Sequence, residues 1–258
     1  DCIPSEILKA GGQPLLSELS TLFLAIWEEG KVPQDLKNGI IVTIFKKHCR
    51  FDCRNYRGIT LLAVIGKLFA RVILDRIWPC IEKYIPEAQC SFRGGRSTSD
   101  MMFALRQLLE KCREQHQELH AVFVDLVKAF DTVSRSLMWA LLKKIGIPSK
   151  VVNIIQSFHD GMEARVLIGG ELTEPFQVTN GLRQGCILAP TLFILLFSFV
   201  LRNAHKDIPD FGVDIKHKLD GKLFNLQRLK AKSTPSTRLD DFLYADDAAL
   251  VTKTCESL

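Results

Sequence analysis

The stretch FLYADDAALVT, Phe242 to Thr252, places two adjacent acids between two short apolar runs. Short apolar runs on either side of turn-forming residues predict a β-hairpin with Asp246 and Asp247 at its tip. Adjacent carboxylates repel one another, and the repulsion grows when they are partly removed from water. The pattern therefore indicates that a positive group compensates the acid pair.

A third acid, Asp125, ends another predicted strand upstream, AVFVD, Ala121 to Asp125. If this strand pairs with the hairpin, three carboxylates gather in one place. Hard oxygen ligands of this kind suit Mg²⁺ or Mn²⁺, and two such ions serve in-line phosphoryl transfer. The plain alternative is that Asp246 and Asp247 only form a turn, since Asp bonds its own backbone there. In the same way, Asp131 is expected to cap a helix.

The rest of the chain predicts an α+β fold with a small antiparallel sheet and helices on one face. Ser97, with Asp100 three residues later, is a typical helix N-cap. The Gly169–Gly170 pair predicts a hairpin turn. Apolar spacing predicts a strand over 39–45 and helices over 15–27, 61–77, 101–109, 134–145, 148–159 and 186–203.

Composition describes a globular chain of 258 residues, with 47% hydrophobic residues, 24% charged residues and a net charge of +5. Eight scattered cysteines without a CxxC pair predict reduced, buried thiols of an intracellular protein. We expect a location in the cytoplasm and nucleus. A metal site at His48, Cys49 and Cys53 is the weaker interpretation, because no second ligand pair follows. The chain opens without a signal peptide, and the apolar run 192–201 is too short to span a bilayer, so we expect no membrane partner.

Two dense basic stretches, 43–71 and 216–238, each contain seven Lys or Arg and a single acid. A charge run is usually a solvated face. Two such runs flanking a predicted metal centre instead favour contact with nucleic acid phosphates.

Three segments, VFVDLVKAFDTV, NGLRQGCILAPTLF and FLYADDAALV, resemble in sequence and order the palm motifs A, B and C of reverse transcriptases of the non-long-terminal-repeat, LINE type. The upstream segments GIIVTIFKK, NYRGITLL, KLFARVILDRI and QCSFRGGRSTSDMMFALRQL resemble the fingers blocks of the same family, and so does the opening IPSEILKAGG. Nearly the whole chain is covered.

The resemblance implies the fingers and palm of a right-hand polymerase, with fingers over 1–118, palm over 119–258, part of 134–180 returning toward the fingers, and the thumb absent. It implies an RNA-directed DNA polymerase that binds template RNA, a DNA primer, deoxynucleoside triphosphates and two Mg²⁺ ions, with Mn²⁺ as a substitute. It leaves the oligomeric state open.

The family's roles carry over to matching positions. The catalytic metal ligands would be Asp125 and Asp246, with Asp247 in less direct contact. The nucleotide-binding residues would be Lys46, Arg57, Phe130 as a gate against the 2′-hydroxyl, Gln184 and Gly185. The residues that bind nucleic acid would be Lys47, Arg93, Arg96 and Tyr244. Six of these residues have a structural alternative: Phe130 and Tyr244 as core, Gln184 and Gly185 as a plain turn, and Arg93 and Arg96 as packing.

Two rival functions remain open. Departures from the family pattern at KKHCR and at Ser91 and Gly94 suit a non-catalytic, nucleic-acid-binding remnant of a retrotransposon. An RNA-dependent RNA polymerase would share the palm chemistry, but Phe130 and the Tyr-Ala-Asp-Asp box argue against it.

Overall fold

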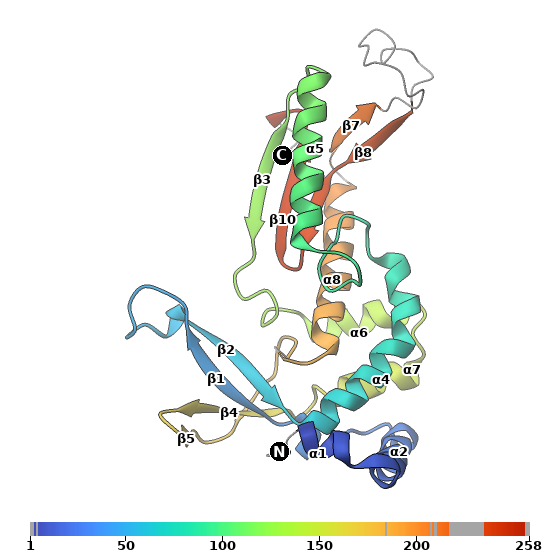
Figure 1. Ribbon diagram of the computed structural model, residues 1–258, viewed down its shortest axis with the longest axis vertical. Helices are drawn as coiled ribbons and strands as arrows, with labels where there is room; N and C mark the ends of the chain where they lie inside the picture. Colours follow the sequence, from blue (N-terminus) through green and yellow to red (C-terminus); the bar gives the residue numbers. More distant parts are fainter. Residues whose placement is uncertain are drawn as a thin grey trace. The chain divides into compact units, whose positions relative to one another are not determined.

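The computed structural model describes residues 3, 5–183, 185–206, 208, 211–216 and 235–255. The chain divides into two compact units, residues 1–84 with 128–193 and residues 85–127 with 194–258. The elements of both are labelled in Figure 1. The division of the chain into fingers and palm stays a prediction.

The first unit contains a sheet ordered β2-β1-β4-β5, with β6 also paired to β4. The predicted strand over 39–45 is confirmed as β1, whose β-branched residues favour an extended chain. It pairs antiparallel with β2 and parallel with β4. The strands are β1 (Gly39–Phe45), β2 (Tyr56–Leu62), β4 (Glu163–Ile168), β5 (Glu171–Leu172) and β6 (Phe176–Gln177).

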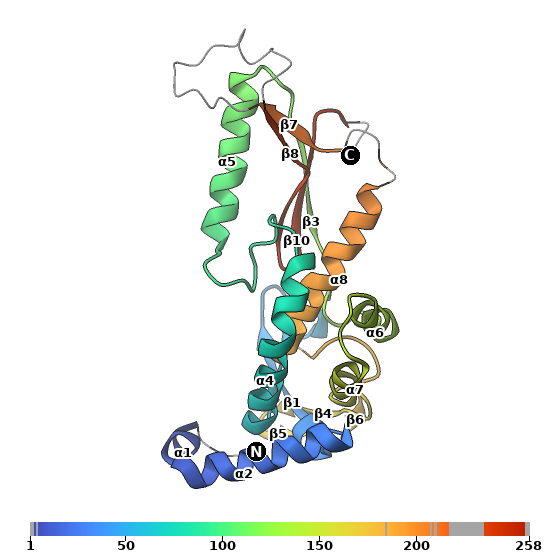
Figure 2. The same ribbon diagram turned by 90° about the vertical axis from the view of Figure 1, so that its right-hand side faces the viewer.

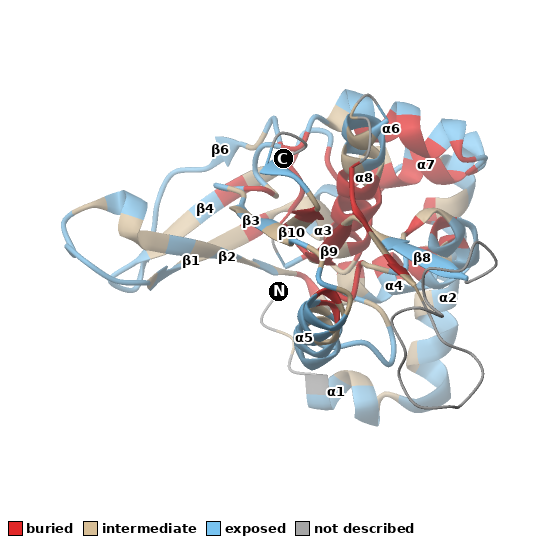
Figure 3. Ribbon diagram, turned by 90° about the horizontal axis from the view of Figure 1, so that it is seen from above, coloured by how far each residue is buried: buried red, intermediate tan, exposed pale blue. Residues whose placement is uncertain are grey.

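Helices of the first unit bury the apolar faces that the sequence predicted. Val152, Ile154 and Ile155 of α7 are completely buried, and the ring of Phe69 contacts the tilted rings of Phe23 and Phe158. Figure 3 shows the buried residues along α7. The helical elements are α1 (Ser5–Ala10), α2 (Gly12–Glu29), α3 (Gln34–Lys37), α4 (Val64–Ile81), α6 (Arg135–Lys144) and α7 (Ser149–Ser157), with 3₁₀ turns η1 (Cys53–Asn55) and η2 (Glu82–Tyr84).

The predicted start of the helix over 61–77 was wrong. The helix expected over 61–77 begins only at Val64, because Leu61 and Leu62 end β2, where they pair with Ile40 and Gly39. Leucines adjacent to a helix can continue its 3–4 spacing by chance, so periodicity alone does not find this boundary.

The second unit is built on the sheet β3-β10-β9, formed by β3 (His120–Asp125), β9 (Asp241–Tyr244) and β10 (Asp247–Thr252). Helix α5 (Thr98–Glu114) covers one face, and its Leu108 and Cys112 pack against Phe242, Ala249 and Val251. Its start is the predicted one, since Ser97 and Asp100 form a reciprocal capping box.

The expected small antiparallel sheet is confirmed, and helices flank it on both sides instead of one. The second half of α8 (Leu188–His205) runs along the side opposite α5 (Figure 2). The reason lies in β9 and β10, where the neighbours Phe242 and Leu243, and likewise Ala248 and Ala249, are all buried. Neighbouring strand residues point to opposite faces, so both faces require cover.

Two short strands were not predicted. β7 (Val213–Lys216) and β8 (Ser236–Leu239) pair antiparallel at the borders of the second basic stretch, which was expected to be irregular. Residues 217–234 of that stretch lie outside the described residues. Among the described helices, α8 is long and apolar enough to cross a membrane, and half of it is buried in the protein interior.

Candidate active site

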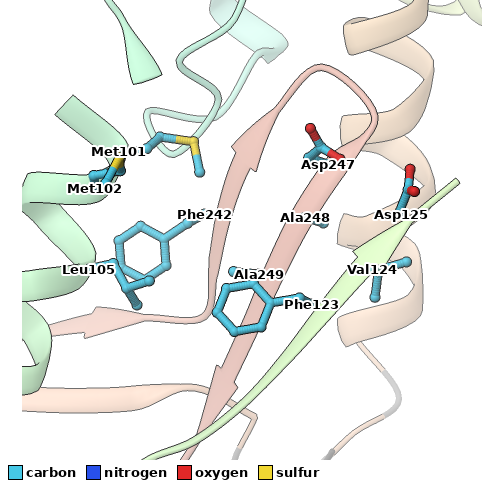
Figure 4. A pocket seen from close by; sticks show the side chains of 10 residues that line it. All are labelled: Met101, Met102, Leu105, Phe123, Val124, Asp125, Phe242, Asp247, Ala248 and Ala249. Carbon is cyan, nitrogen blue, oxygen red and sulfur yellow. The ribbon is translucent and has the colours of Figure 1, made fainter. Parts of the chain in front are cut away.

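Strand register brings two of the predicted acids together. In the antiparallel pair β3–β10, Asp125 stands directly opposite Asp247, and Phe123 stands opposite Ala249. Residues opposite one another in such a pair have Cβ atoms about 4.5–5.5 Å apart and share one face of the sheet. Figure 4 shows the two carboxylates side by side at the same end of the sheet.

The predicted hairpin carries the third acid at its tip. β9 and β10 are joined through Ala245 and Asp246, and Tyr244 pairs with Asp247. Tyr244, Asp247 and Asp125 therefore form a row across three strands. Ala245 has φ +56°, a left-handed conformation that residues other than glycine seldom adopt.

The acids repel one another without a nearby cation. Burial raises the pKa of the Asp247 carboxyl, and the charges of Asp246 and Asp125 raise it further. Within the described ranges, none of the three acids is in a salt bridge. An uncompensated group of carboxylates has the donor chemistry that a hard divalent cation requires.

The carboxylates do not already converge on one point. No group of three His, Cys, Asp or Glu side chains in the described part of the chain is arranged to hold a metal ion. The donor set fits a divalent metal in its chemistry, and the side chains would have to close around the ion.

An apolar cavity of about 300 Å³ lies beside the acids, between α5 and the sheet. Figure 4 shows Asp125 and Asp247 at one end of it and Leu105, Phe123 and Phe242 along its wall. Apolar walls lower the local dielectric and strengthen the electrostatic effect of the carboxylates.

The basic residues expected to meet a nucleotide lie at one end of the β1–β2 hairpin. Lys46 follows β1 directly, and Arg57, the second residue of β2, pairs with Ile44. Both side chains, and that of Lys47, are exposed. The pairing of β1 with β2 thus brings Lys46 and Arg57 to the same end of the hairpin. The sequence analysis did not predict this pairing.

Phe130 is half-buried, and its ring stacks on Phe193 with centroids 4.6 Å apart. Its carbonyl accepts a hydrogen bond from the Leu182 N–H, which ties the Phe130 loop to the segment that precedes Gly185. Gly185 itself is exposed, with φ +104°, and a Cβ there would lie 2.2 Å from the Thr60 carbonyl oxygen. Gln184 lies outside the described residues.

Two arginines that the sequence analysis did not single out, Arg135 and Arg183, fix the segment before Gly185 by hydrogen bonds to backbone carbonyls. Arg135 donates from Nε to the Gly181 carbonyl and from Nη1 to the His159 carbonyl, at 2.9 and 3.0 Å. Arg183 is 4% exposed and donates to the Phe158 carbonyl, and burial lowers its pKa to about 10. These partners are distant in sequence, so only the fold identifies them.

Arg93 and Arg96, predicted to bind nucleic acid, both pair with Glu87. Arg93 also donates to the carbonyls of Pro86 and Gln89. These contacts match the alternative that the two arginines serve packing within the protein.

Comparisons with known proteins agree with this architecture. A family model described as "Reverse transcriptase (RNA-dependent DNA polymerase)" matches residues 44–258. The chain is 24% identical over 261 residues to the RNA-directed DNA polymerase from mobile element jockey of Drosophila melanogaster, covering 98% of this chain and 25% of that protein. It is 27% identical over 198 residues to the probable RNA-directed DNA polymerase from transposon X-element of the same species, covering 76% and 22%.

Solved structures of telomerase share the fold. Apo telomerase from Candida tropicalis, truncated from its C-terminal domain, superposes with a TM-score of 0.57 at 12% identity, covering 95% of this chain and 50% of that one. This likeness supports the expected right-hand polymerase fold, and reverse transcriptases as a class use divalent metal ions. Although it spans about a quarter of the jockey protein, the chain belongs to the reverse transcriptase family.

Proposed function

We propose that this chain is the polymerase core of an RNA-directed DNA polymerase, which extends a DNA primer on template RNA with deoxynucleoside triphosphates. The observation that carries the proposal is the register of β3 and β10, which sets Asp125 opposite Asp247 with Asp246 in the adjoining turn. Three carboxylates without a salt bridge among the described residues suit two divalent cations better than any structural role.

The acids would hold two Mg²⁺ ions, with Mn²⁺ as a substitute. When bound, the ions supply positive charge to the attacking 3′-hydroxyl and to the departing pyrophosphate. Asp125, Asp246 and Asp247 contribute ligands and fix their orientation, so the protein acts through positioning and electrostatics without forming a covalent bond to the substrate.

Lys46 and Arg57 would bind the triphosphate, since both side chains are exposed at the same end of the β1–β2 hairpin. Phe130 would exclude a 2′-hydroxyl by contact with the sugar. Gly185 would let backbone N–H groups approach the nucleotide, as a residue with φ +104° and no side chain can.

Tyr244 would support the primer terminus from its place beside Asp247. Lys47 would contact template or primer phosphates. Arg93 and Arg96 would do so only if a phosphate displaced Glu87. We propose that the protein is intracellular, because the described cysteines are all free thiols. Its location in cytoplasm and nucleus, without a membrane partner, stays a prediction.

The alternative is a non-catalytic nucleic-acid-binding remnant, which the departures in KKHCR and at Ser91 and Gly94 favour. Primer extension by the 258-residue chain separates the two, with an RNA template, a DNA primer and Mg²⁺ or Mn²⁺. Metal-dependent extension with deoxynucleotides, lost in Asp125→Asn, supports the polymerase. Salt-sensitive binding of the hybrid without extension in either metal supports the remnant. Extension with ribonucleotides alone would indicate an RNA polymerase.

A further inference from the structure

Gln89 is fully buried in the second unit, and its side chain hydrogen-bonds to Ala245 in the turn between β9 and β10. We call β9, this turn and β10 the acid hairpin. Its Oε1 accepts hydrogen bonds from the N–H groups of Ala245, at 3.1 Å, and Ser91, at 3.0 Å. Its Nε2 donates to the Ala245 carbonyl at 3.4 Å. One side chain therefore satisfies both backbone groups of Ala245, which are costly to leave unpaired in the interior.

Ala245 is the residue of the hairpin that most needs such support. Its φ of +56° is unfavourable for an L-residue with a side chain, and persists only where the surroundings determine it. Asp246 and Asp247 follow it directly, so the conformation of Ala245 sets the direction in which both carboxylates leave the turn.

The segment that carries Gln89 is itself fixed to the hairpin. The Leu243 N–H donates to the Ala88 carbonyl at 3.1 Å, and the Cys90 N–H donates to the Leu243 carbonyl at 3.0 Å. Gln89 and Leu243 thus form a parallel bridge beside β9. Arg93 also donates a hydrogen bond to the Gln89 carbonyl and so helps to fix the same segment. A side chain anchored in this way loses little entropy when it binds the turn.

The chemistry of an amide suits this place. A Lys or Arg side chain would pair with the adjacent carboxylates and compete with a metal ion, whereas another carboxylate would add to the negative charge of Asp125, Asp246 and Asp247. Glutamine offers both a donor and an acceptor with no net charge.

We propose that Gln89 is a positioning residue of the polymerase reaction: through Ala245 it holds the turn in the one conformation that keeps Asp246 and Asp247 presented beside Asp125. The inference rests on the proposed function. It differs from a role in packing alone, because it predicts an effect on metal use and turnover beyond any effect on stability.

Gln115 provides a matched control in the same unit. It binds both backbone groups of Lys216, donating from Nε2 to the carbonyl at 3.1 Å and accepting from the N–H at 3.3 Å. The hydrogen-bond pattern is that of Gln89 and Ala245, but the partner lies in β7 and not in the acid hairpin.

The experiment compares Gln89→Met, Gln89→Glu and Gln115→Met with the wild-type chain. Amide hydrogen exchange is followed by NMR at Ala245 and Lys216, and primer extension is measured across a Mg²⁺ titration. Gln89→Met keeps the length of the side chain and removes both polar groups. Gln89→Glu keeps the acceptor for Ala245 and Ser91 and loses the donor, so the proposal remains testable if the Met variant does not fold.

In Gln89→Met we expect amide exchange at Ala245 to be at least about tenfold faster. We expect kcat to fall about 10–100-fold while KM for the deoxynucleotide changes less than about threefold. The Mg²⁺ concentration required for activity should rise. Gln89→Glu keeps the acceptor, so it should retain protection at Ala245, whereas the negative charge that it adds beside the acids should still lower kcat. Gln115→Met should speed exchange at Lys216 only, with an unchanged Mg²⁺ requirement.

The positioning role would be overturned if exchange at Ala245 were unchanged in Gln89→Met. It would also be overturned if Gln89→Met and Gln115→Met showed the same loss of kcat and the same Mg²⁺ requirement. The exchange measurement needs no activity, so the two proposals fail separately. A wild-type chain without extension overturns the polymerase, whereas an active wild type with an indifferent Gln89→Met overturns only the role of Gln89.

Discussion

Asp125 and Asp247 are positioned by strand register, whereas Phe130 and Gly185 are positioned by contacts between loops. The two acids follow from six consecutive cross-strand pairs between β3 and β10, so each neighbour supports the next. The Phe130 loop has no strand ladder: two backbone hydrogen bonds, from Leu182 to Phe130 and from Gly181 to Val133, join it to the segment before Gly185, together with one ring stack and the hydrogen bonds of Arg135. We therefore expect substitutions near Asp125 and Asp247, which the β3–β10 pairing positions, to disturb the structure less than substitutions in the loops of Phe130 and Gly185.

The largest effect is expected at Asp125. Asp125→Asn removes a metal ligand without changing the register, and should lower primer extension about 10³-fold or more, since metal stabilisation contributes several kcal/mol. Its thermal stability should stay within about 0.5 kcal/mol of wild type, because the side chain is exposed. Asp75→Asn, which breaks an exposed ion pair with Arg71, is the control and should leave extension intact. Equal losses of primer extension in the two variants would argue against a catalytic role for Asp125.

Glycine substitution tests how strongly the loops depend on close approach. In Gly185→Ala the new methyl meets the Thr60 carbonyl at 2.2 Å in a left-handed conformation, so we expect unfolding to be easier by about 3 kcal/mol. Gly146→Ala has a comparable φ of +91° with nothing within 4 Å of the added methyl, and should cost about 1 kcal/mol. Urea denaturation of both measures the difference. Equal costs would mean that Gly185 serves backbone freedom alone.

Phe130→Ala tests whether the loop forms a sugar gate. It should retain deoxynucleotide extension and lose roughly 1–3 kcal/mol of discrimination against ribonucleotides. Phe23→Ala removes another half-buried ring, whose centroid lies 5.0 Å from that of Phe69, and should lower stability without altering sugar choice. Relative incorporation rates and melting temperatures are measured for both. If Phe130→Ala were destabilised with unchanged sugar selectivity, Phe130 would belong to the core.

The smallest effect concerns a buried acid within the ladder. Burial, and then the charge of Asp240, raise the pKa of Asp241 to about 6. A raised pKa stabilises the fold below the unfolded value near 4, and this stability is lost as the pH rises through 6. Asp241→Asn should therefore gain on the order of 1–2 kcal/mol relative to wild type between pH 4 and pH 7. Denaturation curves at the two pH values check this, and a constant difference would contradict it.

The elements predicted best were those with a local cause. The β-branched residues of Gly39–Phe45 and the capping box of Ser97 and Asp100 act within a few residues, and both were confirmed. The hairpin around Asp246 was also confirmed, because apolar runs and turn formers are adjacent in the chain.

The features missed depend on partners far away in sequence. β7 and β8 have four residues each and are stabilised by pairing with one another and by α5. Gln89 belongs to a stretch recognised for its family resemblance, yet its partner Ala245 is 156 residues away. Arg135 carries no local signal, since its acceptors at Gly181 and His159 are backbone carbonyls.

The most direct test of the account replaces Mg²⁺ by Fe²⁺ and maps the backbone cuts made by hydroxyl radicals generated at the bound iron. The account predicts cuts near Asp125 and near Asp246 and Asp247, suppressed by excess Mg²⁺ and lost in Asp125→Asn. Cuts elsewhere, or none that Mg²⁺ suppresses, would contradict a shared metal site on the paired ends of β3 and β10.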